Sequence, residues 1–494
     1  MEDDPMYLPV YPKPTSMVES SGSFALPLKA EMRISVGAMD EARKDLVCDM
    51  WYRFACTAAK LVIVDDAGLP AHTAVIGCTE CACNETDDYA ITVAESGVCV
   101  KGKDDLGLLR GCYTLLQLIR PVCLDEGSED LQIDCVEVHD RPALGMRAIH
   151  FCLFPETTLD VLEKTIRLAA FMKYTHFVLE PWGALKLDSF PELAWAECSY
   201  SKDEIKPYLK LCNAMGMEVI PMINHLGHAT QSRGGMGRHT VLDQNPRLSL
   251  MFEPDGWTWC LSNPMVHEKL RAVREELIDL CGEGSYFHLG CDESYSYASC
   301  PKCRQQDHIA MLADYLNGLC EELAQKGRRA IIWHDQLLDR TAWERPLVAT
   351  SRPDQKTHLA LEKLDRRLLI ADWQYNITTP ELPTSEYFVQ QGFDVLICPW
   401  DKAGNAVAMH AGADKLGLMG AMDTTWHHMD PMLRGMLEYG GSIWNGANYE
   451  ANPGQGVHCA AILRKIMPHA RSFAKSGFLT HEIDPDYCRI LYGG

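Results

Sequence analysis

Eight short apolar segments recur after residue 140, and each has a length suited to a buried β-strand. They comprise residues 145–151, 175–179, 217–223, 285–290, 329–333, 368–373, 393–399 and 417–425. Helical patterns lie between several of them, as at residues 159–170 and 266–281. Apolar strands that alternate with helices are typical of a parallel sheet covered by helices. We therefore expect a parallel (β/α)8 barrel, a fold that usually takes about 250 residues.

A doubly wound parallel sheet is the alternative architecture for such a pattern. Folds of that kind often carry a glycine-rich phosphate-binding turn after the first strand. No such turn follows the first apolar segment, and the chain contains no G-x-x-x-x-G-K-[ST] motif. These observations favour the barrel and give no indication that the protein uses a nucleotide.

The residues before the barrel pattern predict a small α+β domain. Apolar runs at 61–64, 89–93 and 98–100 are typical of short strands, and residues 107–119 place leucines on one face of a helix. The pattern changes near Asp140-Arg-Pro142. The expected domains are a lead-in over residues 1–25, an accessory α+β domain over 26–140, the (β/α)8 TIM barrel over 141–450, and a helical or loop extension over 451–494 that packs on the barrel or mediates a homodimer.

Composition excludes several classes of partner. The chain has 46 Lys and Arg against 68 Asp and Glu, and the net charge of −22 disfavours binding to nucleic acid or to an anionic membrane. No apolar run is long enough to cross a bilayer. The first residues, Met1-Glu-Asp-Asp-Pro5, lack the basic and apolar regions of a signal peptide. With 21 cysteines, an odd number, the chain is expected to carry reduced thiols in the cytoplasm.

Polar and aromatic residues follow the ends of most predicted strands, where barrel enzymes place their active sites. The strand ends carry His150, Glu180, Asn224, His225, Asp292, Glu293, Trp333, His334, Asp335, Asp372, Trp373, Trp400, Asp401, Trp426, His427 and His428. Four of these ends bear a tryptophan, although the chain has only 11. A single tryptophan could equally pack between the barrel and a helix. Four at equivalent positions favour a carbohydrate pocket, because indole faces stack on the apolar faces of sugar rings.

Asp292 and Glu293 are the strongest candidates for catalysis. They follow the apolar run that begins at Tyr286. Repulsion between adjacent carboxylates and partial burial push their pKa values apart, so that one group is ionised and the other protonated near neutral pH. Glycoside cleavage needs such a pair. The structural alternative is an ordinary acidic loop that caps the next helix.

The string from His288 to Glu293 resembles the His-x-Gly-Gly-Asp-Glu signature of glycoside hydrolase family 20, the β-N-acetylhexosaminidases, and differs from it at Cys291. Arg147 stands in a segment similar to the family's first strand, whose arginine holds hydroxyls of the terminal sugar. His228 matches the histidine that follows the third strand. The resemblance covers about residues 30–450 and extends to a small N-terminal α+β domain.

Further segments resemble later strands of the family. Asn224 stands where the family commonly has an aspartate, and the segments that end at Trp333, Trp373 and Trp426 are similar to the fifth, sixth and eighth strands. The resemblance implies exo-acting, retaining hydrolysis of a terminal β-linked GlcNAc or GalNAc, with no cofactor. It implies that the substrate is a small glycoside or an oligosaccharide with a terminal N-acetylhexosamine.

The implied mechanism is substrate-assisted. Glu293 would protonate the glycosidic oxygen, and the sugar's own acetamido oxygen would attack C1 to give an oxazolinium intermediate. Asp292 would orient the acetamido group and stabilise its positive charge. Trp333, Trp373 and Trp426 would surround the sugar. Retaining enzymes of this family are exceptions to the use of a carboxylate nucleophile.

The sequence departs from the family pattern at residues that recognise the sugar. Glu180-Pro-Trp-Gly183 replaces an aspartate-rich string after the second strand, and His428 stands where a glutamate is common. Trp400 and Asp401 are only approximate counterparts of a Tyr-x-Asp motif. The choice between GlcNAc, GalNAc and a substituted sugar therefore stays open.

Cysteine pairs raise a further alternative. Cys300-Pro-Lys-Cys303 has the spacing of half a zinc site, and Cys78-Thr-Glu-Cys-Ala-Cys83 lies in the N-terminal region. We favour free thiols and no metal, with Cys300 and Cys303 as the candidate pair. Two other functions are weighed against hydrolysis by Asp292 and Glu293: a non-hydrolytic or differently specific sugar-binding barrel, and a metal-assisted hydrolase.

Overall fold

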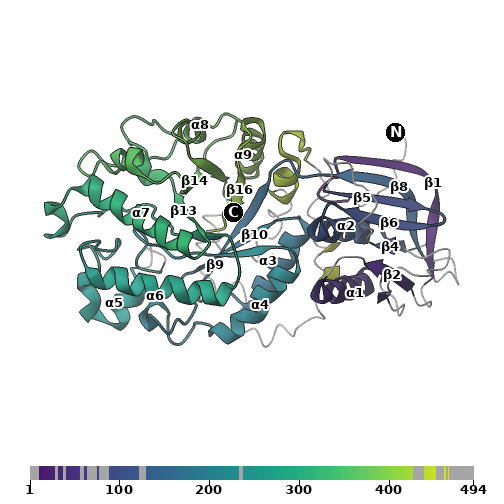
Figure 1. Cartoon of the computed structure of the whole chain (residues 1–494), viewed down its shortest axis with the longest axis horizontal. Coiled ribbons are helices and arrows are strands. Elements are labelled where there is room, and N and C mark those ends of the chain that lie inside the picture. The colour runs from purple at the N-terminus through teal and green to yellow at the C-terminus, as the bar shows by residue number, and fades with distance from the viewer. Residues whose placement is uncertain are drawn as a thin grey trace.

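The protein is described from a computed structural model of the 494-residue chain. The structure describes residues 10–27, 32–36, 40–55, 61–63, 75–76, 88–121, 130–232, 237–426, 439–451, 461–462 and 465–466. It contains an N-terminal sheet domain beside a barrel, as Figure 1 shows. The predicted extension over residues 451–494 lies almost wholly outside the described residues.

The N-terminal domain has one mixed sheet with two helices. Its elements are β1 (Ser16–Pro27), β2 (Met32–Val36), α1 (Glu41–Ala55), β3 (Leu61–Ile63), β4 (Val75–Ile76), β5 (Tyr89–Ala94), β6 (Gly97–Gly102), α2 (Asp105–Leu118), β7 (Arg120–Pro121) and β8 (Asp130–Asp140). The strand order is β1-β8-β5-β6-β4-β2-β3, with β7 beside β8. Helix α2 begins where the side chain of Asp104 accepts a hydrogen bond from the backbone N–H of Gly107.

The prediction of a separate lead-in over residues 1–25 is wrong for its second half. Residues 16–27 form β1, which pairs antiparallel with β8 from Ser16 opposite His139 to Pro27 opposite Asp130. The register shifts between Glu19 and Ser23, where the chain is polar. This irregularity removes the alternation of apolar and polar residues by which a strand is recognised in a sequence.

The second sheet confirms the predicted eight-stranded parallel barrel. Its strands are β9 (Met146–Leu153), β10 (His176–Pro181), β11 (Glu218–Pro221), β12 (Tyr286–His288), β13 (Arg329–Trp333), β14 (Leu369–Trp373), β15 (Asp394–Cys398) and β16 (Gly420–Asp423). Their order, β11-β10-β9-β16-β15-β14-β13-β12, is a path through all eight strands. The path closes by a single parallel bridge between Met222 and His288, and by a hydrogen bond from the backbone N–H of His225 to the carbonyl of Leu289.

Besides the helical residues 439–445, seven α-helices accompany the barrel strands in the described residues. They are α3 (Leu159–Phe171), α4 (Lys202–Ala214), α5 (Thr240–Gln244), α6 (Pro264–Cys281), α7 (His308–Gln325), α8 (Pro383–Gln390) and α9 (Ala403–Leu416). Local sequence sets their starts. Ser201 and Glu204 form a capping box at α4, and Asn263 caps α6 with Pro264 at the first helical position. No helix of the described residues is long and apolar enough to cross a membrane.

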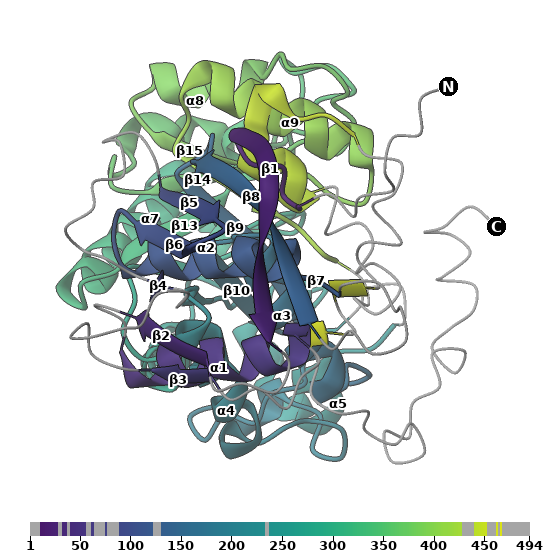
Figure 2. The same ribbon diagram turned by 90° about the vertical axis from the view of Figure 1, so that its right-hand side faces the viewer.

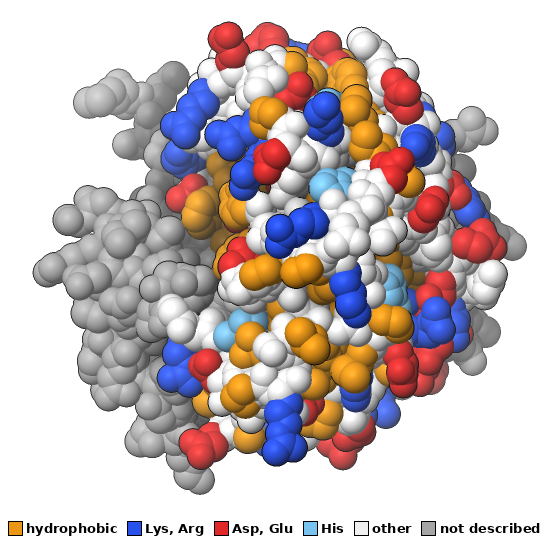
Figure 3. Space-filling model, turned by 90° about the vertical axis from the view of Figure 1, so that its left-hand side faces the viewer, with side chains coloured by type: hydrophobic (Ala, Val, Ile, Leu, Met, Phe, Trp, Pro, Cys, Tyr) orange, Lys and Arg blue, Asp and Glu red, His pale blue; other side chains and the backbone are white. Residues whose placement is uncertain are grey.

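Helix α2 lies between the N-terminal sheet and the barrel, as Figures 1 and 2 show. Tyr113 on α2 stacks on Phe171 with ring centroids 4.7 Å apart, and its hydroxyl donates to the carbonyl of Met215 over 3.0 Å. The N-terminal domain therefore packs on the side of the barrel where the helices end and the next strands begin, opposite the carboxyl ends of the strands. On the face at the left of Figure 1, seen directly in Figure 3, acidic and basic side chains are interspersed.

A buried ion pair connects the two domains. Lys173, which precedes β10, donates from Nζ to Asp140 Oδ2 at the end of β8 over 2.8 Å, and both side chains are fully buried. Asp140 also accepts from the indole N–H of Trp444 and from Tyr89. The Lys173 ammonium lies 4.4 Å from the centroid of the Trp444 ring. Burial lowers the pKa of Lys173 although Asp140 opposes this, so the ammonium depends on these contacts for its charge.

We predict that Lys173→Met destabilises the protein by about 3–5 kcal/mol, because it leaves Asp140 as a buried charge without its partner. Lys13→Met is the matched control. Lys13 pairs with Glu450 over 2.6 Å, but both side chains are more than half exposed, and such a pair contributes at most about 1 kcal/mol. Urea unfolding of the two variants measures the difference. Equal unfolding midpoints would contradict the importance of the buried pair.

Candidate active site

A small cavity lies at the carboxyl ends of the barrel strands and has a volume of about 240 Å³. Seven of its ten lining residues are aromatic rings other than histidine. Six of these come from the strand ends or the chain just after them, and the seventh, Trp257, comes from a loop. The lining residues are Phe154, Trp182, His228, Trp257, Asp292, Glu293, Trp373, Tyr375, Trp400 and Trp426. Two carboxylates and one imidazole are therefore enclosed by aromatic side chains.

The turn after β12 brings the two carboxylates into this cavity through an unusual backbone. Gly290, Cys291 and Glu293 all have positive φ angles, of 66°, 77° and 46°. A Cβ on Gly290 would lie 1.8 Å from Asn224 Oδ1, so no other residue fits there. At φ 77° a residue with a side chain is strained, and the signature that this string resembles has glycine at the position of Cys291.

His228 lies between the two acidic side chains. Its Nε2 is 3.2 Å from Asp292 Oδ2 and 3.3 Å from Glu293 Oε2. The loop after β11 holds it at a positive φ of 54°. Gly227, which precedes His228, lies against the backbone of Asp292. A Cβ on Gly227 would be 2.0 Å from the carbonyl oxygen of Asp292. The loops after β11 and β12 thus fix one another's backbone and place the three ionisable groups together.

Three further residues fix Glu293. The hydroxyl of Tyr295 donates to Glu293 Oε1 over 2.8 Å, and the indole N–H of Trp257 donates to the Glu293 carbonyl over 2.8 Å. The Glu293 backbone N–H donates to Asp335 Oδ2 over 3.0 Å. Burial and the nearby charge of Asp292 raise the pKa of Asp335 to about 6. These contacts restrict the position of Glu293 before any ligand is present.

The site distributes charge differently from the sequence-based expectation. Burial raises the pKa of Asp292, and His228 only partly opposes this. Burial also acts to raise the pKa of Glu293, but hydrogen bonds from His228 and Tyr295 outweigh it and lower the pKa. Burial would lower the pKa of His228, yet the two carboxylates raise it to about 10. These opposite shifts favour a proton on His228, next to Glu293, over a proton on Glu293 itself.

Several predicted sugar-binding residues lie in a buried layer beneath the cavity. Glu180 accepts from Asn224 Nδ2 over 2.6 Å, and its other oxygen is 2.8 Å from His150 Nε2. His288 is buried with its ring centroid 4.3 Å from that of Trp333. Trp333 is itself buried within the barrel and 5.6 Å from Trp426, so it supports the ring that lines the cavity. Glu180, Asn224, His288 and Trp333 thus lie one layer below the lining residues.

The expectation that Arg147 binds the sugar is wrong. Arg147 lies near the start of β9, at the opposite end of the barrel from the cavity. Its guanidinium donates to the carbonyls of Leu144, Gly145 and Lys173 and lies over the Trp444 ring. An arginine two positions into a strand cannot reach the strand's far end. Among the described residues, no arginine lines the cavity.

The remaining predicted residues have varied positions. Trp373, Trp400 and Trp426 line the cavity, whereas Asp401 is half-buried beside Trp400 and does not line it. His428 lies outside the described residues. Four lining residues were not predicted from the sequence, namely Phe154, Trp182, Trp257 and Tyr375. Trp182 and Tyr375 each lie two residues from a recognised strand-end residue, which could have indicated them, but Trp257 lies far along a loop and carries no such signal.

An acidic pair within a ring of aromatic side chains, at the carboxyl ends of a (β/α)8 barrel, defines a barrel enzyme that acts on carbohydrates. Comparison with models of protein families identifies the family of this enzyme. Residues 177–403 match the catalytic domain of glycosyl hydrolase family 20, and residues 7–141 match domain 2 of the same family. The chain belongs to glycoside hydrolase family 20, the β-hexosaminidase family.

Relatives known by sequence are distant. A β-hexosaminidase of Akkermansia muciniphila is 24% identical over 287 residues, covering 51% of this chain and 56% of that protein. A lacto-N-biosidase of Bifidobacterium bifidum is 20% identical over 267 residues, covering 51% of this chain and 23% of that protein. The chain thus spans only about a quarter to about half of these relatives.

Solved structures share the fold over nearly the whole chain. A chitobiase of Flavobacterium johnsoniae superposes with a TM-score of 0.70 at 17% identity, over 92% of this chain and 72% of that chain. An exo β-N-acetylglucosaminidase of Vibrio harveyi, in complex with N-acetylglucosamine, superposes with a TM-score of 0.69 at 15% identity. The match covers 93% of this chain and 77% of that chain. At such identities the likeness establishes the fold alone.

We predict that Gly290→Ala abolishes glycosidase activity and destabilises the protein by about 1–3 kcal/mol, because its methyl group would overlap Asn224 at a positive φ. Gly404→Ala is the control. A Cβ on Gly404, within α9, meets no atom within 4 Å, and alanine favours a helix by up to about 1 kcal/mol. Thermal unfolding and glycoside turnover of both variants test this. A fully active Gly290→Ala would show that the close contact is not required.

Proposed function

We propose that the protein is an exo-acting, retaining β-N-acetylhexosaminidase that removes terminal β-linked GlcNAc or GalNAc by substrate-assisted catalysis. The observation that carries this proposal is the contact of His228 with both Asp292 and Glu293 inside the aromatic cavity. The family supplies the class of reaction, and the geometry supplies a role for each group.

The size of the cavity supports exo-action on a single sugar. Its volume of about 240 Å³ is below the about 300–1,000 Å³ typical of sites for drug-sized ligands. Trp373, Trp400 and Trp426 offer ring faces to one saccharide, and removal of water strengthens the electrostatic interactions within the cavity.

A second cavity provides space for the rest of the substrate. It has a volume of about 670 Å³, and it shares Phe154 and Trp182 with the first. Trp195 and Arg238 also line it, with the guanidinium 4.9 Å from the Trp195 ring centroid. We propose that the leaving portion of an oligosaccharide binds here, across the shared pair of rings.

The acid step uses the proton on His228. When the sugar enters, the glycosidic oxygen comes within reach of Glu293, and Nε2 of His228 passes its proton to Glu293 Oε2, 3.3 Å away. Glu293 then donates this proton to the leaving oxygen as the bond from C1 breaks. A water molecule later attacks C1, and Glu293 accepts its proton. Such general acid–base steps typically contribute about 10²–10⁴-fold.

Asp292 acts on the acetamido group. Its buried carboxylate is the only anion beside Glu293 that lines the cavity in the described residues. Attack by the acetamido oxygen on C1 leaves positive charge on the amide, and an ionised Asp292 stabilises it through the N–H. Transfer of the His228 proton to Glu293 leaves the negative charge concentrated on Asp292, where the oxazolinium ion needs it.

The other functions considered are less well supported. A sugar-binding barrel that does not hydrolyse its ligand needs neither the acidic pair, Asp292 and Glu293, nor the contact of that pair with His228. A metal-assisted hydrolase needs a set of metal ligands in the cavity, but neither group of three or more candidate ligands among the described residues lines it. The cytoplasmic location and the homodimer stay predictions. The cysteines that the structure describes form no disulfide with one another, as expected in a reducing compartment.

Release of 4-nitrophenol from its β-GlcNAc and β-GalNAc glycosides tests the proposal. We expect turnover by the wild type and a loss of at least about 10²-fold in kcat/KM for Glu293→Gln, which cannot carry the proton. Glu283→Gln, an exposed position at the end of α6, is the control and should retain activity. A thiazoline analogue of the intermediate should inhibit the wild type. Binding of the thiazoline without any turnover of either glycoside would instead support the sugar-binding alternative.

The pH dependence of kcat/KM tests the role of His228. Because the pKa of His228 is raised to about 10, the proton is retained at neutral pH and is lost as the pH rises through that value. The alkaline limb of the wild type should therefore lie near pH 10. In His228→Gln only Glu293 can hold the proton, and the limb should move to lower pH. His358→Gln, at a histidine that does not line the cavity, should leave the profile unchanged. An unshifted limb in His228→Gln would contradict the proposed proton transfer.

A further inference from the structure

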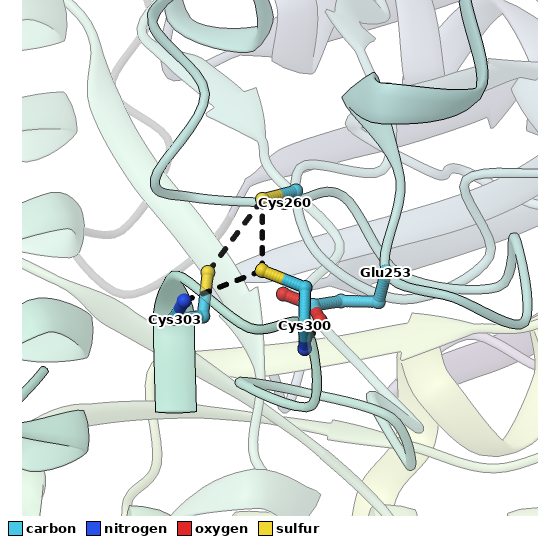
Figure 4. Close-up of side chains that lie close together, drawn as sticks. All are labelled: Glu253, Cys260, Cys300 and Cys303. Atoms are coloured by element: carbon cyan, nitrogen blue, oxygen red, sulfur yellow. Dashed lines mark hydrogen bonds between the residues drawn. The ribbon is translucent and has the colours of Figure 1, made fainter. Parts of the chain in front are cut away.

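Four potential metal ligands lie close together, as Figure 4 shows, and none of them lines the cavity. Glu253 and Cys260 come from the loop between β11 and α6, and Cys300 and Cys303 come from the loop after the catalytic pair. All four side chains are buried. One ligand atom of each lies within 4.8 Å of the corresponding atom of every other. Three sulfur atoms and one carboxylate thus face a common point.

The distances between the sulfur atoms match those around a tetrahedral metal ion. Cys260 Sγ is 3.6 Å from Cys300 Sγ and 3.6 Å from Cys303 Sγ. Disulfide sulfurs are about 2.05 Å apart, so these thiols are not bonded to each other. A tetrahedral ion with metal–sulfur bonds of about 2.3 Å places its sulfurs about 3.8 Å apart.

The surrounding hydrogen bonds hold the ligands in place. The backbone N–H of Cys303 donates to Cys300 Sγ over 3.2 Å, a contact that stabilises a thiolate. Ser299 Oγ donates to Glu253 Oε2 over 3.1 Å, and the backbone N–H of Cys300 donates to the same oxygen over 2.5 Å. These donors fix the Glu253 carboxylate next to the sulfur atoms.

We propose that Cys260, Cys300, Cys303 and Glu253 bind one Zn²⁺ ion. Three thiolates and a carboxylate form a complete tetrahedral set without a position for water, which is typical of structural and not of catalytic zinc. Binding releases the thiol protons to solvent. From the sequence we favoured no metal and named only Cys300 and Cys303 as a candidate pair, because the other two ligands lie about forty residues earlier in the chain.

The ion would hold together the two loops that build the active site. Between Glu253 and Cys260 lies Trp257, whose indole N–H donates to the Glu293 carbonyl. Thr258 accepts a hydrogen bond over 2.9 Å from Ser296, three residues after Glu293. The zinc ion would therefore stabilise the position of Trp257 against Glu293 without touching the substrate. The zinc proposal does not depend on the proposed hydrolytic activity.

Metal analysis of the full chain tests the proposal. The protein is purified without chelator from cells grown with added zinc, and the metal is measured by elemental analysis and by the mass of the native chain. We expect close to one zinc per chain. Cys300→Ser and Glu253→Gln should lose most of the zinc, while Cys198→Ser, which removes an exposed thiol, should retain it. Cobalt-substituted protein should show the sulfur-to-metal charge-transfer absorption of a thiolate site.

Two results would overturn the proposal. One is a wild-type chain that contains no stoichiometric metal even after exposure to Zn²⁺. The other is a native chain lighter by two hydrogens, with a disulfide between two of the three cysteines, which would assign the cluster to thiol oxidation. Both results are read on the wild-type protein, so a variant that fails to fold cannot obscure them, and neither requires that the protein hydrolyse a glycoside.

Discussion

The close contact between the loops after β11 and β12 is the constraint on which the site depends. The barrel closes here by one bridge, between Met222 and His288. Beyond that bridge the loops after β11 and β12 remain in contact. Gly290 packs against Asn224, and Gly227 packs against the backbone of Asp292. Neither glycine has space for a side chain. The contact that closes the barrel therefore also positions the acidic pair, Asp292 and Glu293.

The same contact determines the electrostatics. His228 follows Gly227, so the approach of the backbones delivers its imidazole between Asp292 and Glu293. Each group alone would lose its charge on burial, since desolvation raises the pKa of the acids and lowers that of the histidine. Together, the two carboxylates raise the pKa of His228, and His228 in turn acts to lower the pKa of each carboxylate.

The sequence predicted the parts of the structure that depend on local patterns. All eight barrel strands lie where apolar segments indicated them, and helix α2 follows its leucine pattern. The edge strand β1 was missed because its bulge interrupts the alternation on which recognition of a strand depends.

Within the site, the sequence did not show how far along its strand each residue lies, and this limited the prediction of which residues line the cavity. The strand-end rule indicated Asp292, Glu293 and the tryptophans, but it could not distinguish Trp426, which lines the cavity, from Trp333, which lies beneath it. The prediction for Arg147 was wrong because the resemblance identified the strand but did not show that Arg147 lies near its start, away from the cavity. Trp257 and Glu253 could not be inferred, because loop residues are brought to a site only by tertiary contacts.

The central claim is that the substrate's own acetamido oxygen is the nucleophile. A series of 4-nitrophenyl β-glycosides whose N-acetyl group carries none, one, two or three fluorine atoms tests it most directly. Fluorine withdraws electrons from the carbonyl oxygen while the leaving group stays constant. If that oxygen attacks C1, kcat/KM must fall steeply with each added fluorine. A kcat/KM that is the same across the series would contradict the account and assign the nucleophile to a carboxylate of the protein.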